Sequence, residues 1–407
     1  MYVISAEFFL QLIGSAFMST LPLFMRIEHY TDGQVADATK FRYLGVLATA
    51  LLVGAYIRGR KLKNLFFISA FFVPASALAV IYTIQLHSVN LNHFAQLLWG
   101  ASFTFMQIPV LPFILRNSEK QDHTSAISLS YATWSIATIL SSALIALLNK
   151  IDPLLFSEKN LLYLIAFSGF ISVLLIARVK LDEFVPDVTS AKTVTRKKDV
   201  VVIIRALIPT LIIAVGAGFT IPFISLFFVN VHKMTTSGFN AVNLVASLFV
   251  AFSALMVPHI KRSIGYKLAI PATQSFAIIA LVLMATTQFY AELNVAVYIA
   301  IGCFLLRQPL MNMAGPMTTE VTMNYVGKRN REIVSALSAA IWSGSWFFSG
   351  MIFGELRDRK VDYVNIFMIT AGLYTIGVVW YFFLIRDHEK REKERKARKE
   401  MIRNKSD

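Results

Sequence analysis

Charged residues are scarce in this chain of 407 residues. They make up 15% of the sequence, against roughly 25% in soluble domains. Hydrophobic residues make up 56%, and the mean hydropathy is +0.60. A soluble core cannot bury that much apolar surface, so the composition excludes a soluble domain and predicts a protein embedded in the lipid bilayer.

Cysteine and histidine are too few and too scattered to build a reactive centre. The one cysteine, Cys303, excludes a disulfide framework and fits a reducing compartment. The seven histidines all fall in predicted loops or at the ends of predicted spans. Neither a metal set nor a histidine-activated nucleophile can therefore be assembled at membrane depth. We predict no enzyme activity, no catalytic residue, no metal and no cofactor.

The apolar residues fall into runs of about 20, long enough at 1.5 Å per residue to cross a hydrocarbon core of ~30 Å. We therefore predict an all-α membrane protein with twelve transmembrane helices, six in each half. No lysine or arginine precedes Tyr2, so we expect no cleaved signal peptide. The predicted spans are 2–25, 38–57, 64–85, 93–115, 125–149, 160–178, 203–230, 237–259, 267–290, 294–317, 333–354 and 363–385.

The motif L-S-x-A-x-W-S occurs twice, which indicates an internal repeat. The copies occupy residues 129–135 and 337–343, 208 residues apart, with five identities. A glutamine followed by a proline precedes each copy, and glycine followed by proline stands near the start of each half. These anchors are Gln107 with Pro109, Gln308 with Pro309, Gly14 with Pro22, and Gly216 with Pro222.

Lysine and arginine are unevenly distributed over the predicted loops. Alternate loops, starting after the second span, hold 18, and the tail from Arg386 adds 10. Because basic loops stay in the cytoplasm, we predict a multi-pass protein of the cell (inner) membrane with both termini cytoplasmic. The +15 net charge then needs no nucleic-acid partner. The opposite side has nine basic residues, Arg26, Lys40, Arg42, Lys150, Lys159, Lys233, Arg357, Arg359 and Lys360.

Residues 179–200 are polar and mixed in charge, which is typical of a linker. This cytoplasmic linker separates an N-terminal six-helix bundle, 1–178, from a C-terminal six-helix bundle, 201–385. Residues 386–407 form a charged cytoplasmic tail, with ten basic and six acidic residues at partly i,i+4 spacing.

Glu7 places a carboxyl group inside the first predicted span. Gln11, Gly14 and Met18 share its helix face. A carboxyl group is costly in lipid, so this face should look into protein or water. Three interpretations are open: Glu7 extends to the membrane interface, forms a structural ion pair, or takes part in proton coupling or ligand binding.

Arg307 is the strongest single signal. It lies 13 residues after Asn294, roughly 20 Å into the tenth span. Its guanidinium stays charged, and a central arginine costs at least ~2.5–3.5 kcal/mol to insert. Either it pairs with an acid such as Glu7 and closes a gate, or it faces a water-filled cavity and holds an anionic group by a bidentate contact. Gln308 and Asn312 add hydrogen-bonding capacity nearby.

Polar residues also line the fourth and seventh spans. Gln107 belongs to a polar stripe, and a buried amide must find a partner in a neighbouring helix or in a ligand. Thr220 and Ser225 flank a proline, a pattern that either frees backbone groups for a site near mid-membrane or accompanies close helix packing. The predicted ligand-binding residues are therefore Gln11, Gln107, Thr220, Ser225, Arg307, Gln308 and Asn312, with Glu7 and Arg307 as coupling or gating residues.

Two segments resemble the major facilitator superfamily. The loop at 54–61 keeps the glycines and the Gly-Arg-Lys cluster of the family signature but lacks its aspartate, and the matching loop at 258–267 has no acid either. The charge relay of that signature is therefore in doubt. The segment 307–312, followed by Pro316, Arg331, Trp342, Gly350 and Gly354, is similar to a large prokaryotic, twelve-helix branch of the family.

The resemblance covers the chain up to residue 385. It implies two pseudo-symmetric six-helix bundles that rock around a central site lined by helices 1, 4, 7 and 10. The implied function is secondary active transport of a small solute by alternating access, by a monomer in the lipid bilayer. Arg307 favours an anionic or carboxylate-bearing substrate, and Glu7 favours proton coupling.

Three alternatives remain open. One is an efflux permease for hydrophobic or cationic compounds, although residues 135–148 lack the glycine and proline that drug antiporters of the family carry there. Another is a transporter-like sensor that binds its ligand without moving it. The third is a carrier of a lipid or lipid-linked substrate, which a lateral opening between the halves would distinguish.

Overall fold

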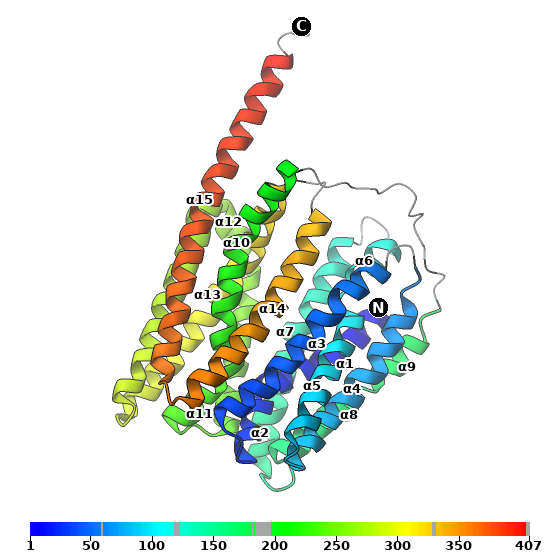
Figure 1. Cartoon of the computed structure of the whole chain (residues 1–407), viewed down its shortest axis with the longest axis vertical. Helices are drawn as coiled ribbons and strands as arrows, with labels where there is room; N and C mark the ends of the chain where they lie inside the picture. The colour runs from blue at the N-terminus through cyan, green and yellow to red at the C-terminus, as the bar shows by residue number, and fades with distance from the viewer. Residues whose placement is uncertain (58–59, 118–122, 181–182, 184–196, 328–330, 404–407) are drawn as a thin grey trace.

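The computed structural model describes residues 1–57, 60–117, 123–180, 183, 197–327 and 331–403. Within these ranges the regular secondary structure is helical, and no strand is present (Figure 1). The helices are α1 (Tyr2–Ser19), α2 (Leu21–Ile27), α3 (Asp32–Tyr56), α4 (Lys63–Gln85), α5 (Val89–Gln107), α6 (Val110–Asn117), α7 (His123–Ile151), α8 (Glu158–Ser168), α9 (Ile171–Ala177), α10 (Lys197–Thr220), η2 (Ile221–Phe223), α11 (Ile224–His232), α12 (Thr236–Thr286), η3 (Thr287–Tyr290), α13 (Asn294–Val326), α14 (Arg331–Asp358) and α15 (Tyr363–Arg403).

Several spans are interrupted at prolines and at one glycine. Pro22, Pro109 and Pro222 lie where α1 passes into α2, α5 into α6, and α10 through η2 into α11. Proline has no N–H and clashes with the preceding turn, so the helix breaks there. Gly265 has a φ of 67° and divides α12 into two spans. The result is the predicted arrangement of twelve spans, six in each half.

Helices α3 and α14 are the most polar of the twelve spans. Ten helical stretches of the described residues are long and apolar enough to cross a membrane, and these two helices are not among them. They have 25 and 28 residues, which correspond to ~37 and ~42 Å. Because α3 and α14 pack against each other, protein covers part of their polar surface.

Helix α3 begins at Asp32, ahead of the predicted residue 38. A capping box starts it: the Thr31 side chain accepts from the Gln34 N–H at 3.2 Å, and the Gln34 side chain accepts from the Thr31 N–H at 2.9 Å. The span therefore starts six residues earlier than predicted, and Lys40 and Arg42, counted above with the basic residues of the non-cytoplasmic side, lie deeper in the helix than expected. Both lie inside α3, and Arg42 is about 15 Å from its start.

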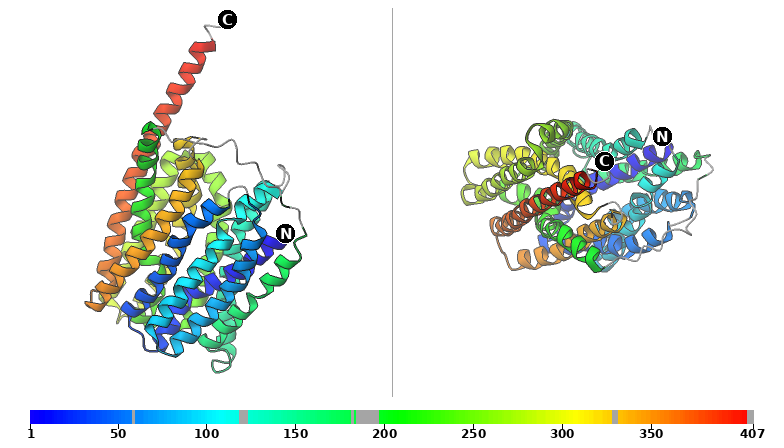
Figure 2. Two further views of the ribbon diagram at one scale, coloured as in Figure 1. Left: turned by 45° about the vertical axis from the view of Figure 1, so that its right-hand side comes forward. Right: turned by 90° about the horizontal axis from the view of Figure 1, so that it is seen from above.

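The two halves meet along two helix pairs, α3 with α14 and α7 with α12 (Figures 1 and 2). Small residues allow close approach in the first pair. A methyl group added to Gly354 would lie 3.3 Å from the Gly33 carbonyl oxygen, and one added to Gly350 would lie 3.5 Å from the Lys40 Cβ. A larger side chain at Gly354 would therefore separate α3 from α14.

Replacing Gly354 by leucine should lower the melting temperature of the detergent-solubilised protein. The added side chain meets backbone at Gly33, and overpacking of this kind costs about 1–3 kcal/mol. Gly372→Leu is the control, because nothing lies within 4 Å of its Cβ position. Equal melting temperatures for the two variants would show that the close approach of α3 and α14 contributes no stability.

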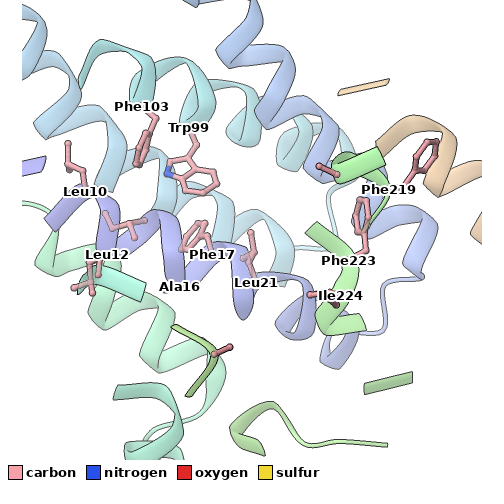
Figure 3. Close-up of a cluster of buried hydrophobic side chains, with 14 of the residues drawn as sticks. Leu10, Leu12, Ala16, Phe17, Leu21, Trp99, Phe103, Phe219, Phe223 and Ile224 are labelled. Atoms are coloured by element: carbon pink, nitrogen blue, oxygen red, sulfur yellow. The ribbon is translucent and has the colours of Figure 1, made fainter. Parts of the chain in front are cut away.

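An aromatic cluster fixes α1 against α5 (Figure 3). Trp99 is buried between Phe17, at 4.6 Å between ring centroids, and Phe103, at 6.3 Å. Gly14 leaves room for this packing, since a Cβ there would lie 3.3 Å from the Phe103 ring. The cluster holds the Trp99 ring in one position beside α3.

Helix α15 continues past the helical bundle, so the segment predicted as a charged tail is helical as far as Arg403 (Figure 1). We call the end of the bundle where α15 emerges the tail end, and the opposite end, with α2 and α11, the Asp32 end. Most of the predicted linker at 179–200 lies outside the described residues, as do Arg58 and Gly59 of the loop at 54–61 and the last residues of the tail, 404–407.

Candidate functional site

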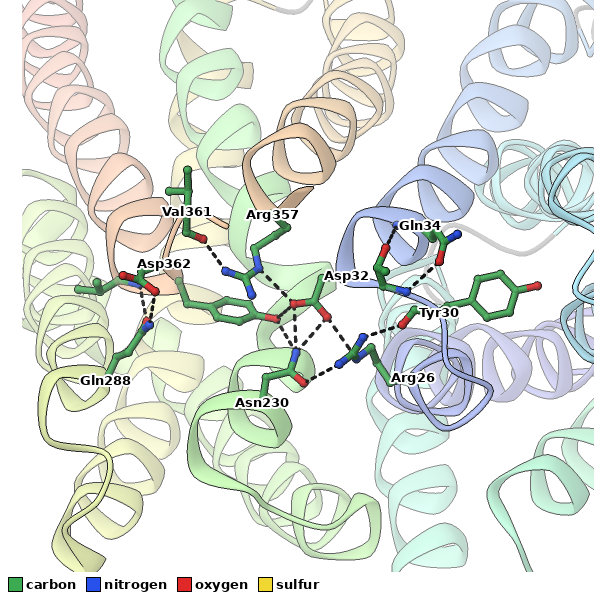
Figure 4. A network of polar contacts seen from close by, with 12 residues as sticks. Arg26, Tyr30, Asp32, Gln34, Asn230, Gln288, Arg357, Val361 and Asp362 are labelled. Atoms are coloured by element: carbon green, nitrogen blue, oxygen red, sulfur yellow. Dashed lines mark hydrogen bonds and ion pairs between the residues drawn. The ribbon is translucent and has the colours of Figure 1, made fainter. Parts of the chain in front are cut away.

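Asp32 is the centre of a polar cluster at the Asp32 end (Figure 4). It opens α3, and its side chain is only 7% exposed. Within the same half, Arg26 Nε lies 3.3 Å from the Asp32 carboxylate, and Arg26 Nη1 donates to the Tyr30 carbonyl at 2.7 Å. The Tyr30 hydroxyl donates to the Ile84 carbonyl at 3.2 Å. Burial raises the pKa of Tyr30, so this hydroxyl remains a donor at neutral pH.

The second half supplies three more donors to the same carboxylate. The Tyr363 hydroxyl donates to Asp32 at 2.5 Å, Arg357 Nε at 3.1 Å, and Asn230 Nδ2 at 3.0 and 3.1 Å to the two oxygens. The Arg357 guanidinium also lies over the Tyr363 ring, 4.1 Å from its centroid. One buried carboxylate thus holds two arginines, and it links both halves of the molecule.

Further hydrogen bonds between the halves lie near this cluster. Thr20 and Asn240 are joined at 3.2–3.3 Å. Asn243 donates to Ser142 at 2.9 Å, and Ser237 donates to the Ala146 carbonyl at 3.0 Å. These contacts connect Thr20, at the junction of α1 and α2, and α7 of the first half to the start of α12, so the Asp32 end is closed by polar contacts as well as by helix packing.

A narrow recess lies inside the closed end. Its walls come from both halves, since α1, α2, α3 and α5 supply most of its lining and Pro222 of η2 supplies the rest. Arg42 lies in this recess with its guanidinium 4.0 Å from the Trp99 ring centroid. Gln96, one turn before Trp99, is also in the lining and is buried.

Arg42 was not among the predicted site residues, because the predicted start of its helix, residue 38, lies only four residues before it. The signal that could have found it was the Thr31 to Gln34 capping box, which fixes the helix start and puts Arg42 at membrane depth.

Glu7 lies in the interior of the first half. Its side chain is 4% exposed, and Ser130 of α7 donates to its carboxylate at 2.7 Å. Gln11, one turn further along α1, lies beside it. The interpretation that Glu7 extends to the membrane interface is therefore wrong. The structural ion pair is also excluded in this conformation, since no basic group of the described residues pairs with it.

Arg307 is buried in the second half, with 1% of its side chain exposed. Its Nε and Nη2 have no hydrogen-bond partner among the described residues. The Tyr374 hydroxyl lies beside the guanidinium. The predicted pair with Glu7 is not formed here, because Glu7 is hydrogen-bonded to Ser130 and Arg307 pairs with no described carboxylate.

The structure distributes the other predicted ligand-binding residues over different surroundings. Thr220 is fully buried and donates to Thr370 at 2.8 Å, so its hydroxyl is used within the second half. Asn312 is exposed and donates to the Gln308 carbonyl at 2.8 Å. Gln107 is exposed at the end of α5, and the buried Ser225 hydroxyl has no partner among the described residues. No described hydrogen bond joins any of these side chains to Arg307.

The family model of the Major Facilitator Superfamily matches residues 3–350, most of the chain. The chain belongs to the major facilitator superfamily. Membership makes it a multi-pass membrane transporter of small solutes rather than an enzyme, as the sequence predicted, and it agrees with the helical fold described above.

Solved structures of major facilitator transporters share the fold at low identity. A D-xylose-proton symporter has 10% identity and a TM-score of 0.75, covering 93% of this chain and 95% of its own. The nucleoside transporter NupG has 11% identity and a TM-score of 0.72, covering 94% of this chain and 98% of its own. A bacterial homologue of the iron transporter ferroportin matches in two states. Its inward-facing structure has 14% identity and a TM-score of 0.69, covering 94% of this chain and 97% of its own. Its outward-facing structure has 12% identity and a TM-score of 0.61, covering 95% of this chain and 98% of its own. No curated protein matches the chain significantly.

Proposed function

We propose that this major facilitator protein is a secondary active transporter of a small solute, and that the Asp32 cluster is the gate at one end of its path. The observation that carries the proposal is the position of the polar contacts between the halves. Wherever both partners are described, the hydrogen bonds and ion pairs that join the halves lie at the Asp32 end. This arrangement suits a state that is closed there and open towards the tail end.

The membrane orientation identifies this state as inward-facing, because the end that is open faces the cytoplasm. With Lys40 and Arg42 inside α3, the basic residues are still more concentrated on the side of the linker and tail. By the positive-inside rule, the tail end faces the cytoplasm of the inner membrane, and so do both termini. The ferroportin homologue supports the assignment, since it resembles the chain more closely in its inward-facing state, at 0.69, than in its outward-facing state, at 0.61.

The two bundles, residues 1–178 and 201–385, move relative to each other in this proposal. Both contribute to the gate and to the recess within one chain, so one copy supplies a complete path and the transporter acts as a monomer. Arg307 is the coupling or gating residue of the second bundle. No described group satisfies its Nε and Nη2 in this state, and it gains a partner when the bundles move or the solute arrives.

Glu7 is the residue that binds and releases the coupled proton in this proposal. It is buried without a cation, next to Ser130 and Gln11, and a carboxyl group in such surroundings can carry a proton across the membrane without leaving its helix.

Glu7→Gln should abolish uphill accumulation of the solute in proteoliposomes with an imposed proton gradient. Exchange of labelled for unlabelled solute should persist, because glutamine mimics the protonated carboxyl group. Glu355→Gln is the control, since that side chain is 62% exposed and its one ion pair among the described residues is with Arg359. If Glu7→Gln accumulates the solute like the wild type, Glu7 is not the coupling residue.

A ligand screen tests the transport function. The purified full chain is heated with sugars, amino acids, carboxylates, sugar phosphates, nucleosides and lipophilic cations, and a ligand at 100 times its Kd adds about 2.7 kcal/mol of stability. Stabilising compounds are then tested for exchange in proteoliposomes. Exchange supports the proposal. A ligand that binds without exchange identifies a sensor, and stabilisation by lipophilic cations alone identifies an efflux permease.

A further inference from the structure

We propose that the recess around Arg42 binds the oxyanion group of the transported solute, a carboxylate or a phosphate. The inference deepens the proposed function and rests on it. The recess is placed where a transported solute must pass. It lies just inside the closed Asp32 end, both halves line it, and Arg42 is about 15 Å along α3 from the gate residue Asp32.

Arg42 differs from the other arginines near the Asp32 end because it has no acidic partner. Arg26 and Arg357 both bind Asp32, and Lys40 of the same helix pairs with Asp37. Arg42 forms neither an ion pair nor a hydrogen bond with any described residue. Its guanidinium lies over two aromatic rings, 4.0 Å from the Trp99 centroid and 5.6 Å from the Tyr43 centroid. Stacking uses the face of the guanidinium and leaves its N–H groups, which lie in the plane, free to donate.

A second donor in the same recess is also unsatisfied. Gln96 is 1% exposed, and its Nε2 has no acceptor among the described residues. Thr39 also lines the recess, and the only described hydrogen bond of its hydroxyl is the one that it donates to the Val35 carbonyl at 2.7 Å. The recess therefore contains two hydrogen-bond donors, the charged Arg42 guanidinium and the buried Gln96 amide nitrogen, and no described acceptor pairs with either. A group with two or more acceptor oxygens and a negative charge completes this set.

The remaining lining selects for size and for an apolar body. Phe17, Met18, Leu21 and Met25 surround the donors, and their apolar surface strengthens a charge-assisted hydrogen bond by excluding water. Methionine side chains adapt to irregular shapes. In this closed state the recess has a free volume of ≈ 10 Å³, about that of one water molecule. A small organic acid with its oxyanion on Arg42 and Gln96 therefore enters only when these apolar side chains move apart to receive its carbon skeleton.

The test measures the binding of named anions to the full-length protein. Lactate, succinate, benzoate and inorganic phosphate are added to wild-type protein and to Arg42→Gln, Gln96→Leu and Lys40→Gln variants, and thermal shift and tryptophan fluorescence are recorded. At least one anion should stabilise the wild type. Arg42→Gln should weaken its binding about 30-fold or more, as expected when one partner of a buried charged pair is removed. Lys40→Gln, whose side chain pairs with Asp37, should bind like the wild type.

Comparing organic acids with phosphate tells the two kinds of oxyanion apart. Binding that is lost in Arg307→Gln but kept in Arg42→Gln would overturn the inference, and so would a wild type that none of the four anions stabilises. If Arg42→Gln does not fold, two other variants test whether Arg42 binds the anion. Arg42→Lys should still weaken binding, because lysine lacks the planar guanidinium group. Trp99→Phe should remove most of the fluorescence change on binding, because it lacks the indole ring.

Failure of the inference and failure of the proposed function give different results. An anion that binds through Arg42 but is not exchanged in proteoliposomes leaves the site intact and refutes transport. A neutral solute that the wild type and Arg42→Gln exchange equally well leaves transport intact and refutes the role of Arg42.

Discussion

Replacing Asp32 by alanine should open the Asp32 end of the transporter. The carboxylate accepts from Tyr363, Arg357 and Asn230 of the second half and pairs with Arg26 of the first. Without it, two guanidinium groups remain close together with no anion between them. Removing one partner of a buried charged cluster costs about 3–5 kcal/mol. Since the cluster exists only when the halves meet, that cost falls on the closed state.

A change of ~3 kcal/mol shifts the ratio of two conformations about 150-fold. We therefore expect the outward-open state to become well populated and net transport to fall sharply, because the variant no longer returns readily to the closed form. The protein should still fold, since the rest of each bundle is untouched.

Cysteine labelling measures this opening. Leu21 is 5% exposed and lines the recess just inside the gate, so Leu21→Cys in a Cys303→Ser background should react slowly with a membrane-impermeant maleimide. Adding Asp32→Ala should raise the rate at least tenfold. Asp37→Ala is the matched control, because Asp37 lies in the same helix and its ion pairs among the described residues are with Lys40 and His93 of its own half. Equal labelling rates in both backgrounds would show that Asp32 is not the gate.

Replacing Arg307 by methionine should make the protein more stable and abolish transport. A buried ion without a partner carries a desolvation penalty of several kcal/mol, and Arg307 has two unsatisfied nitrogen atoms at 1% exposure. Methionine fills a similar volume without a charge. We expect a gain of about 1–4 kcal/mol, together with the loss of exchange, as at other functional residues that proteins retain at the expense of stability.

The melting temperature and the rate of solute exchange, measured on the same preparation, test the expected gain in stability and the expected loss of transport. Arg205→Met is the control, because the Arg205 side chain is 54% exposed and lies 3.8 Å from Asp387, so its removal should change neither quantity much. A lower melting temperature for Arg307→Met would mean that the guanidinium is satisfied in the folded protein and serves its structure.

The sequence predicts the fold well because the signals of a membrane helix are local. Runs of apolar residues, and prolines such as Pro22 and Pro222, can be identified without knowing the rest of the chain. The repeat at 129–135 and 337–343 adds the two-fold organisation, and the structure places the copies in α7 and α14, each of which packs against the other half. The start of α3 was placed six residues too late, and its polar surface is partly covered by α14.

The gate could not be predicted from the sequence, because its members become neighbours only through the fold. Asp32 and Tyr363 are 331 residues apart, and neither belongs to a recognisable motif. Asp32 at the start of a helix resembles an ordinary first-turn acid. Arg307 was predicted correctly as a buried cation, since its depth follows from counting residues, but its lack of a partner depends on three-dimensional packing.

The length of α15 has a practical consequence. Its 41 residues make a rod of ~61 Å, about twice the thickness of the hydrocarbon core. Near the point of emergence, Asp387 accepts from Tyr325 at 2.7 Å and lies 3.8 Å from Arg205, which ties the rod to α13 and α10. The projecting part therefore turns with the second half as one lever, and a spin label or fluorophore near Arg403 would report a small rotation of that half as a larger displacement.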